Sequence, residues 1–285
     1  MVAPILIGVL LVIGVAVVVA LIMRHQFVAH LAALERQLQR PGSSRGRRTD
    51  LPSEVVALAA RMGAQSGGGS CFAVFEQTGQ MWSALGGKPM KFKARQTVRT
   101  DAPGFLWRAT MGLPTGMMIA DYLVAETGGL EVRLLGAFSV ARMVGGADAY
   151  QGEALRYLAE LPWNPDAILT NRALDWTVVD TKTIKVTTGV GAARGEVTLN
   201  LDERGLVIGM SAPSRIYAEK KGQTTRHPWR GRFWNYQPMG GRLLPRQGEV
   251  AWDLKAGEFI YRRGCILSWN ASMETRPATP SNHPR

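Results

Sequence analysis

The sequence predicts a mainly β protein: an antiparallel meander that forms a curved half-barrel or barrel, with one or two covering helices and an N-terminal transmembrane helix. Three observations lead to this fold class. The chain begins with a long apolar run, short strand-like runs alternate with Gly- or Pro-containing turns from Cys71 onward, and no βαβ unit repeats. Of 285 residues, 46% are hydrophobic and 20% are charged, a composition that excludes a disordered chain.

The apolar run Val2–Met23 contains no charged residue, no Asn and no Gln. As a helix, its 22 residues span about 33 Å, which matches a bilayer core of about 30 Å. A buried core helix is rarely apolar on every face. A cleaved signal peptide normally has a basic first segment and an apolar stretch of roughly 7–15 residues. We therefore expect residues 1–23 to be a retained single-pass anchor.

Residues 24–50 form a basic segment with six arginines and two acidic residues. The positive-inside rule then favours a cytoplasmic location for the rest of the chain. The same arginines also suit a helix that lies on anionic lipid, so the side of the membrane stays open. Phe27–Leu38 has apolar residues at helical spacing and predicts a juxtamembrane helix, whereas Pro41–Arg48 has the composition of a flexible linker.

Residues 51–270 are predicted to form the β-rich body, covered by helices at Pro52–Met62 and Tyr150–Leu161, with a short turn at Pro165–Asn171. Ten to twelve twisted strands in one sheet must curl, close or split. Residues 271–285 lack apolar periodicity, and we expect a disordered tail. The candidate strands are Cys71–Trp82, Met90–Arg99, Phe105–Met111, Met117–Val124, Leu130–Val144, Trp176–Thr181, Ile184–Thr188, Glu196–Leu201, Leu206–Tyr217, Arg230–Tyr236, Gly248–Leu254 and Glu258–Trp269.

Catalytic and metal-binding motifs are missing from the sequence. Of the four histidines only His227 lies in the predicted body, so a metal site built from histidines is not expected. No G-x-S-x-G motif, P-loop or dinucleotide-binding glycine motif is present in the required context. We assign no catalytic residue, no metal and no cofactor.

Arg156 and Glu160 lie at i and i+4 of the predicted helix and therefore share one face. A structural ion pair is the simpler interpretation. The alternative is a buried pair at the mouth of a cavity, which orients a polar head group or takes part in acid–base chemistry.

Basic charge is concentrated late in the chain. Residues 215–263 hold eleven Lys and Arg against four acidic residues, whereas residues 51–214 are balanced at fifteen of each. Three interpretations remain: solvated outer faces of strands, a surface attracted to anionic lipid, or a nucleic-acid site. No nucleic-acid-binding module is recognisable, so nucleic acid is the least expected partner. The candidate anionic-surface patch consists of Arg226, Arg230, Arg232 and Arg242.

Eight tryptophans lie in or beside the predicted strands. Most are expected in the core, but a half-barrel lined with Trp, Leu and Met also leaves a concave apolar face of the kind that binds hydrophobic ligands. Together with Arg156 and Glu160, the candidate ligand-binding residues are Trp107, Tyr122, Trp163, Trp176 and Trp252.

Several blocks of the body resemble an uncharacterised bacterial family of membrane-anchored proteins, a domain of unknown function. The blocks span Leu51 to Ile266, and the family implies no activity, substrate or catalytic residue. A looser similarity, of architecture alone, is to curved-sheet carriers of lipids or lipoproteins in the bacterial periplasm, on the opposite side from the cytoplasmic expectation. The matching blocks are Phe92–Gln96, Gly104–Ala109, Asp121–Tyr122, Gly152–Glu160, Leu161–Pro165, Leu174–Trp176, Pro228–Phe233, Leu244–Pro245 and Glu249–Trp252.

These observations predict a single-pass protein of the bacterial inner membrane whose concave sheet binds a hydrophobic or amphiphilic, lipid-like ligand without catalysis. Membrane lipid, a small hydrophobic ligand and a partner protein are the expected partners. Two alternatives stay open, so the sequence does not decide whether the protein is an enzyme. One is an enzyme of unfamiliar type that uses Glu160, Arg156 and His227. The other is a membrane-associated interaction scaffold, which predicts an exposed apolar patch and no internal cavity.

Overall fold

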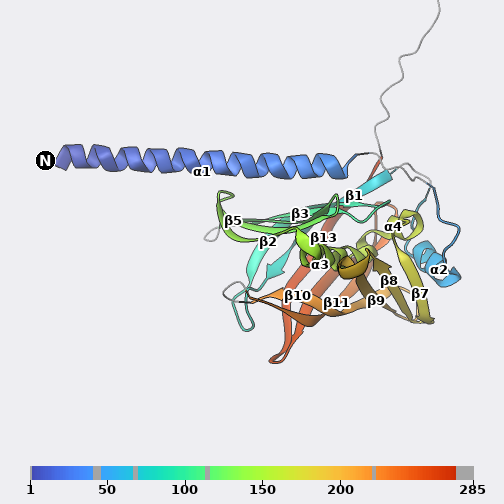
Figure 1. Cartoon of the computed structure of the whole chain (residues 1–285). Helices are drawn as coiled ribbons and strands as arrows, with labels where there is room; N and C mark the ends of the chain where they lie inside the picture. Colours follow the sequence, from blue (N-terminus) through green and yellow to red (C-terminus); the bar gives the residue numbers. More distant parts are fainter. Residues whose placement is uncertain (1, 41–45, 67–69, 113–115, 220–222, 274–285) are drawn as a thin grey trace, which may run out of the picture.

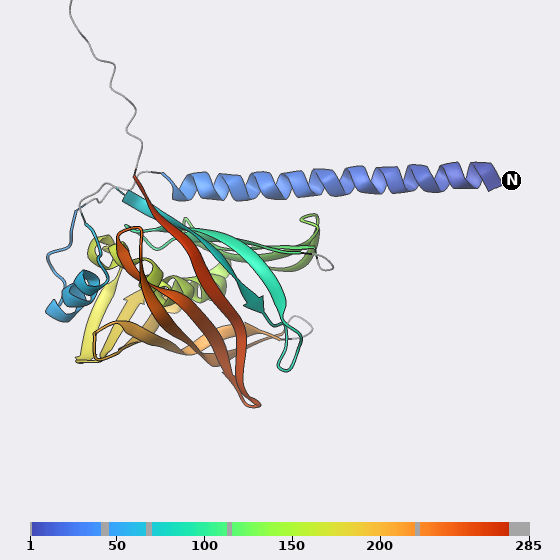
Figure 2. The ribbon, with the colours of Figure 1, turned by 180° about the vertical axis from the view of Figure 1, so that it is seen from behind.

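The computed structural model describes residues 2–40, 46–66, 70–112, 116–219 and 223–273 (Figure 1). Thirteen strands within these residues form one sheet in the order β6-β5-β4-β3-β2-β1-β13-β12-β11-β10-β9-β8-β7. Every neighbouring pair is antiparallel. The sheet curls around a helix (Figures 1 and 2). The predicted fold class, an antiparallel curved half-barrel, is confirmed.

The first strand, β1, lies in the middle of the sheet, and one series of strands then runs outward while a second runs from the opposite edge back to the middle. The first series runs from β1 to one edge: β1 (Ser70–Met81), β2 (Met90–Arg99), β3 (Phe105–Met111), β4 (Met117–Val124), β5 (Thr127–Leu134) and β6 (Phe138–Val144). The second begins at the opposite edge and ends at β13, which pairs with β1: β7 (Asp175–Asp180), β8 (Thr183–Thr188), β9 (Gly195–Leu201), β10 (Val207–Ala218), β11 (Thr224–Met239), β12 (Arg242–Leu254) and β13 (Gly257–Met273). Residues far apart in sequence therefore meet on the inner face.

The predicted strand Leu130–Val144 is two strands in the structure. Leu135 and Gly136 have φ angles of +54° and +75°, which reverse the chain between β5 and β6. Glycine adopts such a conformation readily, whereas leucine does so only under the constraint of a tight turn. Tight turns at Asp202–Gly205 and Leu254–Gly257 likewise end in glycine, with φ angles of +71° at Gly205 and +111° at Gly257.

Helix α3 (Gly146–Ala159) links the two edges of the sheet and lies inside its curve (Figure 1). It contacts β4 and β5 on one side and β8, β9 and β10 on the other. Residues 152–159 are all buried. The close approach depends on Gly128 in β5, because a Cβ built there would lie 2.4 Å from the carbonyl oxygen of Ala149.

One end of the half-barrel is closed by short helices. Helix α2 (Ser53–Arg61) packs against α4 (Pro165–Thr170), which follows the 3₁₀ turn η1 (Leu161–Trp163). Val55, Leu58 and Met62 are fully buried in the core there. The sequence placed both covering helices over the open face, whereas only α3 lies there and α2 lies at the end (Figure 1).

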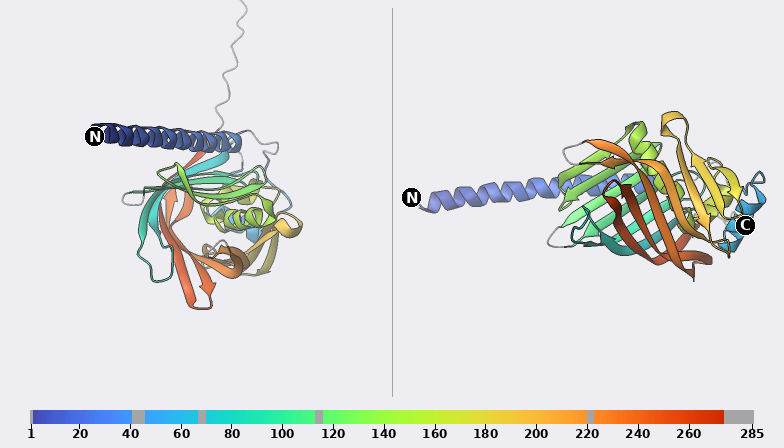
Figure 3. Two further views of the ribbon diagram at one scale, coloured as in Figure 1. Left: turned by 60° about the vertical axis from the view of Figure 1, so that its left-hand side comes forward. Right: turned by 90° about the horizontal axis from the view of Figure 1, so that it is seen from below.

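Helix α1 (Val2–Leu38) is continuous from the apolar run into the predicted juxtamembrane helix. Its C-terminal part packs outside β2–β4, where Phe27, Leu31 and Leu38 are buried with Leu106 and Tyr122. Its N-terminal part projects beyond the sheet with apolar side chains exposed (Figure 3). By length and composition this helix is able to cross a membrane.

The docking of α1 is fixed by polar contacts as well. The carboxylate of Glu35 accepts a bond from Thr97 Oγ1 at 2.9 Å and pairs with Arg108 Nη2 at 2.7 Å. Arg99 Nη1 donates to the carbonyl oxygens of Leu38 and Arg40, both at 2.8 Å, at the C-terminal end of the helix. The helix is therefore held rigidly against the outer face of the sheet.

Two predicted segments lie partly outside the described residues: 41–45 of the basic linker and 274–285 of the tail. At the end of the linker, Arg48 is buried and its Nη1 donates to the carbonyl oxygen of Asn171 at 3.0 Å. Strand β13 extends to Met273, three residues into the range assigned to the tail.

A charged and aromatic cavity as the candidate functional site

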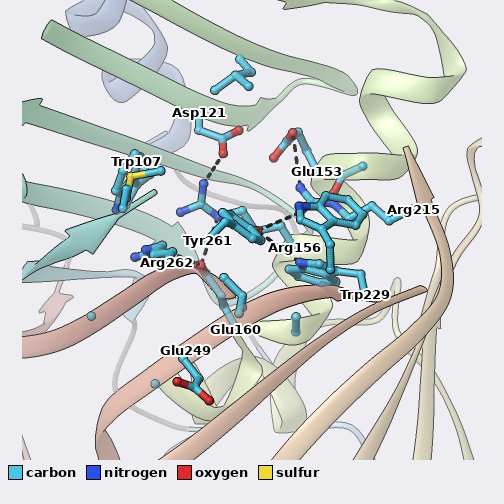
Figure 4. Close-up of a pocket in the computed structure, with 18 of the residues that line it drawn as sticks. Trp107, Asp121, Glu153, Arg156, Glu160, Arg215, Trp229, Glu249, Tyr261 and Arg262 are labelled. Atoms are coloured by element: carbon cyan, nitrogen blue, oxygen red, sulfur yellow. Dashed lines mark hydrogen bonds and ion pairs between the residues drawn. The ribbon is translucent and has the colours of Figure 1, made fainter. Parts of the chain in front are cut away.

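A cavity of about 370 Å³ lies between α3 and the concave face of the sheet. One side is aromatic and comes from β11, β12 and β13: Trp229, Phe233, Trp252, Phe259 and Tyr261. The other side is charged and comes from β4, β10, β13 and the C-terminal half of α3 with the residue that follows it (Figure 4): Asp121, Glu153, Arg156, Glu160, Arg215 and Arg262. We call these six residues the charged cluster. Glu249 of β12 also lines the cavity, but it pairs with Arg232 and Arg263 and does not belong to the cluster.

Helix α3 supplies half of the charged cluster through its periodicity. Glu153, Arg156 and Glu160 lie at positions i, i+3 and i+7, which share one face of the helix. Arg156 Nε donates to Glu160 Oε1 at 3.0 Å, and its Nη1 donates to Asp121 Oδ2 of β4. The guanidinium of Arg156 also lies 5.0 Å from the ring centre of Trp107.

Arg262 of β13 reaches the same carboxylate from the opposite side. Its Nη1 lies 3.4 Å from Glu160 Oε1, and its Nη2 donates to Gln77 Oε1 at 2.7 Å. Gln96 Nε2 donates to the other oxygen of Glu160 at 2.6 Å. Glu160 is thus one buried carboxylate shared between two guanidinium groups.

Arg215 of β10 joins the charged side to the aromatic side. Its Nη2 lies 3.9 Å from Glu153 Oε1, and its Nε donates to the Gly152 carbonyl oxygen at 3.2 Å. Its guanidinium lies 4.4 Å from the ring centre of Trp229, within the range of a cation–π contact. Trp229 Nε1 in turn donates to the hydroxyl of Tyr261 at 3.1 Å.

Burial and charge shift the protonation equilibria of this cluster. Burial, with a further contribution from the nearby Asp121 carboxylate, raises the pKa of Glu153 well above its usual value. Burial alone would lower the pKa of Arg156, but Glu160 and Asp121 outweigh it and raise that pKa. Burial and the charge of Arg156 lower the pKa of Arg262. The cluster therefore favours a charged Arg156 beside a protonated Glu153.

Five of the seven predicted ligand-binding residues line this cavity: Trp107, Arg156, Glu160, Trp163 and Trp252. Tyr122 instead lies on the outer face beneath α1, where burial and Glu131 raise its pKa to about 12. Trp176 belongs to the edge strand β7 and packs against the core outside the cavity lining.

His227 is absent from the residues that line the cavity. Its ring contacts Tyr217 at a centroid distance of 5.5 Å, and its Nε2 lies 3.0 Å from Thr225 Oγ1. Arg156 and Glu160 are in contact with each other, but His227 does not join them. Within the described residues, no group of three or more His, Cys, Asp and Glu is arranged to hold a metal ion.

Sequence reasoning missed Asp121, Glu153, Arg215 and Arg262 as cavity residues. Only Glu153 carried a local signal, because it shares the helical face of Arg156 and Glu160. The other three come from strands β4, β10 and β13, and only the sheet order brings them together. No sequence spacing between these three residues indicates that they lie close together in the fold.

Two of the four candidate patch residues, Arg230 and Arg232, lie on the convex face. Arg230 pairs with Asp253 at 2.7 Å, and Arg232 pairs with Glu258 at 2.8 Å. Arg226 is exposed but pairs with Asp148 of α3, inside the curve of the sheet. Arg242 is buried and its Nη2 lies 2.6 Å from Asp166 Oδ2 beside α4. The four arginines therefore do not form one surface, and attraction of Arg230 and Arg232 to anionic lipid stays a prediction.

Residues 44–264 match the model of a family of unknown function, DUF6544. The chain belongs to this family. The resemblance to a domain of unknown function is therefore confirmed, and the DUF6544 region includes the whole cavity and excludes the apolar part of α1. No curated protein matches the chain at a significant level.

Three solved structures show a weak similarity to this DUF6544 protein. A LolA superfamily protein from Nitrosomonas europaea is 10% identical, with a TM-score of 0.41 and coverage of 76% of this chain and 92% of the other. A DUF1329 family protein from Desulfovibrio piger is 12% identical, with a TM-score of 0.44 and coverage of 78% and 93%. A putative outer membrane lipoprotein-sorting protein domain from Vibrio parahaemolyticus is 9% identical, with a TM-score of 0.42 and coverage of 79% and 93%. At these values the similarity says nothing about a ligand.

Proposed function

We propose that this protein holds one hydrophobic or amphiphilic, lipid-like ligand in the cavity, beside a bacterial inner membrane in which α1 is a single-pass anchor. The observation that carries the proposal is the cavity itself, with an aromatic wall facing a small set of polar groups. Such concave, mostly apolar sites are typical of small-ligand binding. Its volume of about 370 Å³ lies at the lower end of the usual range of roughly 300–1,000 Å³.

The geometry also favours a cavity that opens toward the membrane. The residues Met81, Trp82 and Ser83 line the cavity where β1 ends, away from the end closed by α2 and α4 (Figure 1). Helix α1 projects in the direction away from α2 (Figure 3). The open end and the anchor therefore point to the same side.

A contact between the β5–β6 turn and α1 indicates where the membrane surface would lie. The turn between β5 and β6 touches α1 at Arg24, because a Cβ built on Gly136 would lie 3.2 Å from Arg24 Cγ. Arg24 is the first charged residue after the apolar run. The same hairpin exposes Leu135, Phe138 and Val140 to 52%, 46% and 61%. We infer that this hairpin rests on the bilayer and that the ligand exchanges with lipid at this end.

The test is to fill the cavity without weakening the fold. Gly152 lines the cavity from within α3, and a Cβ there meets only the Ile216 side chain, at 3.5 Å. Gly152→Leu therefore blocks the cavity while improving helix propensity by about 0.8 kcal/mol. Full-length protein, extracted in mild detergent, is analysed for co-purified lipid by mass spectrometry. We expect a stoichiometric ligand in the wild type and its loss in Gly152→Leu.

Ala147→Leu is the matched control, because Ala147 is exposed in the first turn of the same helix. It places the same leucine side chain outside this cavity and should keep the ligand. Equal lipid content in wild type and Gly152→Leu would contradict the proposal, as would a wild type that carries no lipid and binds none.

The two alternative functions make demands that the structure meets less well. The enzyme hypothesis rests on Arg156 and Glu160, which do meet in the cavity, but its third candidate, His227, lies outside the cavity lining. The scaffold hypothesis expects no internal cavity. Binding in the cavity is the better-supported function.

A further inference from the structure

We propose that the charged cluster is the binding site for the single negative charge of a single-chain amphiphile, a carboxylate or phosphate-ester head group, whose chain lies along the aromatic wall. This inference rests on the proposed function and names the chemical class of its ligand. It is carried by three observations: unpartnered donors, an imbalance of charge and the position of the aromatic wall.

The first observation is the unpartnered donors. Arg156 Nη2 and Arg262 Nε are buried and have no hydrogen-bond partner among the described residues. Both arginines line the cavity, and both guanidinium groups lie 5.0 Å from the ring centre of Trp107. Buried donors normally have partners, because an unmade bond is costly. Two cationic donors beside one ring provide what an oxyanion requires.

The second observation is the charge of the cluster. Three arginines of the cluster face three carboxyl groups, and Glu153 Oε2 and Asp121 Oδ1 are both buried without a hydrogen-bond partner among the described residues. Burial, with the nearby Asp121 carboxylate, raises the pKa of Glu153 and so favours its protonated form. Asp121 and Glu160 then leave one of the three guanidinium charges uncompensated. Buried charges are paired, so a monoanion completes the cluster.

The third observation is the way in which β13 joins the charged and aromatic sides. The pairing of β12 with β13 shifts register between Val250–Arg262 and Ala251–Ile260, which leaves Tyr261 as an extra residue. This β-bulge places Tyr261 and Arg262 on the same face, and both line the cavity. The neighbour of Arg262 in the chain, Tyr261, contacts the rings of Trp252 and Phe259 at centroid distances of 5.9 Å and 6.4 Å, so the aromatic wall begins beside the charged cluster. The small volume favours one chain over two.

The experiment compares ligands that share a chain and differ in head group. Full-length protein in phosphatidylcholine nanodiscs is titrated with dibromostearic acid, with dibromostearyl alcohol and with brominated lysophosphatidylglycerol. Bromine quenches tryptophan fluorescence, and Trp107, Trp229 and Trp252 line the cavity. We expect at least one of the two anions to bind about tenfold more tightly than the alcohol, the gain typical of a charge-assisted hydrogen bond. The tighter anion identifies carboxylate or phosphate ester as the head group.

Variants test which arginine causes the preference for the anion. Arg262→Gln should abolish most of the tenfold preference for the anion, read as the ratio of the affinities for anion and alcohol in the same variant. Arg230→Gln is the matched control, because Arg230 and its partners Asp253 and Glu258, at 2.7 Å and 2.9 Å, all lie outside the cavity lining. It should keep the full preference. Arg262→Lys keeps the charge without the Nε donor and should give an intermediate preference.

The outcomes separate the two proposals. Equal binding of acid, lysolipid and alcohol, as expected if the site holds only water, overturns the head-group inference and leaves binding in the cavity intact. A preference that survives in Arg262→Gln also overturns it. No quenching by any of the three probes overturns both proposals. If Arg262→Gln does not fold, the wild-type comparison and Arg262→Lys decide.

Discussion

Strands β11–β13 carry arginines on both faces, and the two sets differ in their exposure to solvent. Arg262 faces the cavity with 9% of its side chain exposed, whereas the adjacent Arg263 faces solvent with 54% exposed. On the convex face, Arg230 and Arg232 share the carboxylate of Glu258, which is 28% exposed. On the concave side, Arg156 and Arg262 share Glu160, which is 9% exposed. Each carboxylate is thus shared by two arginines, but Glu258 is accessible to solvent and Glu160 is buried.

This contrast explains why the basic excess of residues 215–263 does not by itself define an interaction surface. Convex pairs lie in high dielectric, where an ion pair contributes little to stability. Concave pairs have lost their water, so each charge depends on the groups around it. The convex Arg230 and Arg232 each have carboxylate oxygens within 2.9 Å and are partly exposed to water, whereas Arg156 Nη2 and Arg262 Nε are buried without a described hydrogen-bond partner. Function is therefore expected on the concave side.

The largest effect is expected from removing the shared carboxylates. Glu160→Ala leaves Arg156 and Arg262 buried without their common partner and should destabilise the protein by about 3–5 kcal/mol. Glu258→Ala, its convex counterpart, should cost less than about 1 kcal/mol. Thermal unfolding of the full chain in detergent measures both, at about 2–4 °C per kcal/mol for a body of this size.

Measuring both variants at several ionic strengths tests the same difference between the two faces. The cost of Glu258→Ala should shrink as ionic strength rises, because exposed pairs are screened, while the cost of Glu160→Ala should stay constant. Equal melting temperatures of the two variants would show that water reaches both carboxylates and would remove the distinction between the faces.

The concave face was predictable where its signal is local. Period-two alternation and glycine turns gave the meander, and the i, i+4 spacing of Arg156 and Glu160 gave their shared face. Trp107 of β3 was found because large aromatic residues in a curved sheet tend to face inward, whereas Trp163 lies in η1 and was selected as a tryptophan beside the predicted strands. These inferences need only a few consecutive residues.

The rest of the cavity depends on information that the sequence spreads over long distances. In β4, residues on both faces are buried, because α1 covers the outside and the core covers the inside, so alternation did not show that Asp121 faces inward and Tyr122 outward. In β13, the bulge breaks alternation and turns both Tyr261 and Arg262 inward. Strict alternation would have placed one of them outside.

Two glutamates should respond to pH in opposite ways. Burial raises the folded-state pKa of Glu153 above its unfolded value, so folding takes up a proton and stability falls as the pH rises above about 4.5. Burial would also raise the pKa of Glu249, but its bonds to Arg263 and Arg232 outweigh this and lower it. Its contribution is present above pH 4.5 and is lost as the pH falls.

Glu153→Gln and Glu249→Gln test this difference by thermal melting between pH 4 and pH 9. Relative to the wild type, Glu153→Gln should gain stability as the pH rises, by at most about 1.4 kcal/mol per pH unit. Glu249→Gln should be less stable at neutral pH and approach the wild type in acid, with a smaller amplitude because its arginine partners are about half exposed. Parallel pH profiles for the two variants would contradict the assignment of Glu153 as the protonated group.

The smallest effect separates charge from stacking. Arg215→Lys keeps a positive charge but loses the planar group that lies 4.4 Å from the ring centre of Trp229 and the Nε bond to Gly152. We expect a loss of about 1–2 kcal/mol, since a desolvated cation–π contact and a fixed donor geometry are both specific to arginine. Arg230→Lys, on the convex face, should stay within about 0.5 kcal/mol of the wild type, because lysine serves an exposed ion pair almost as well. If Arg215→Lys and Arg230→Lys have the same melting temperature, the aromatic wall does not hold Arg215 in place. The charged and aromatic halves of the cavity would then have to be treated as independent sites.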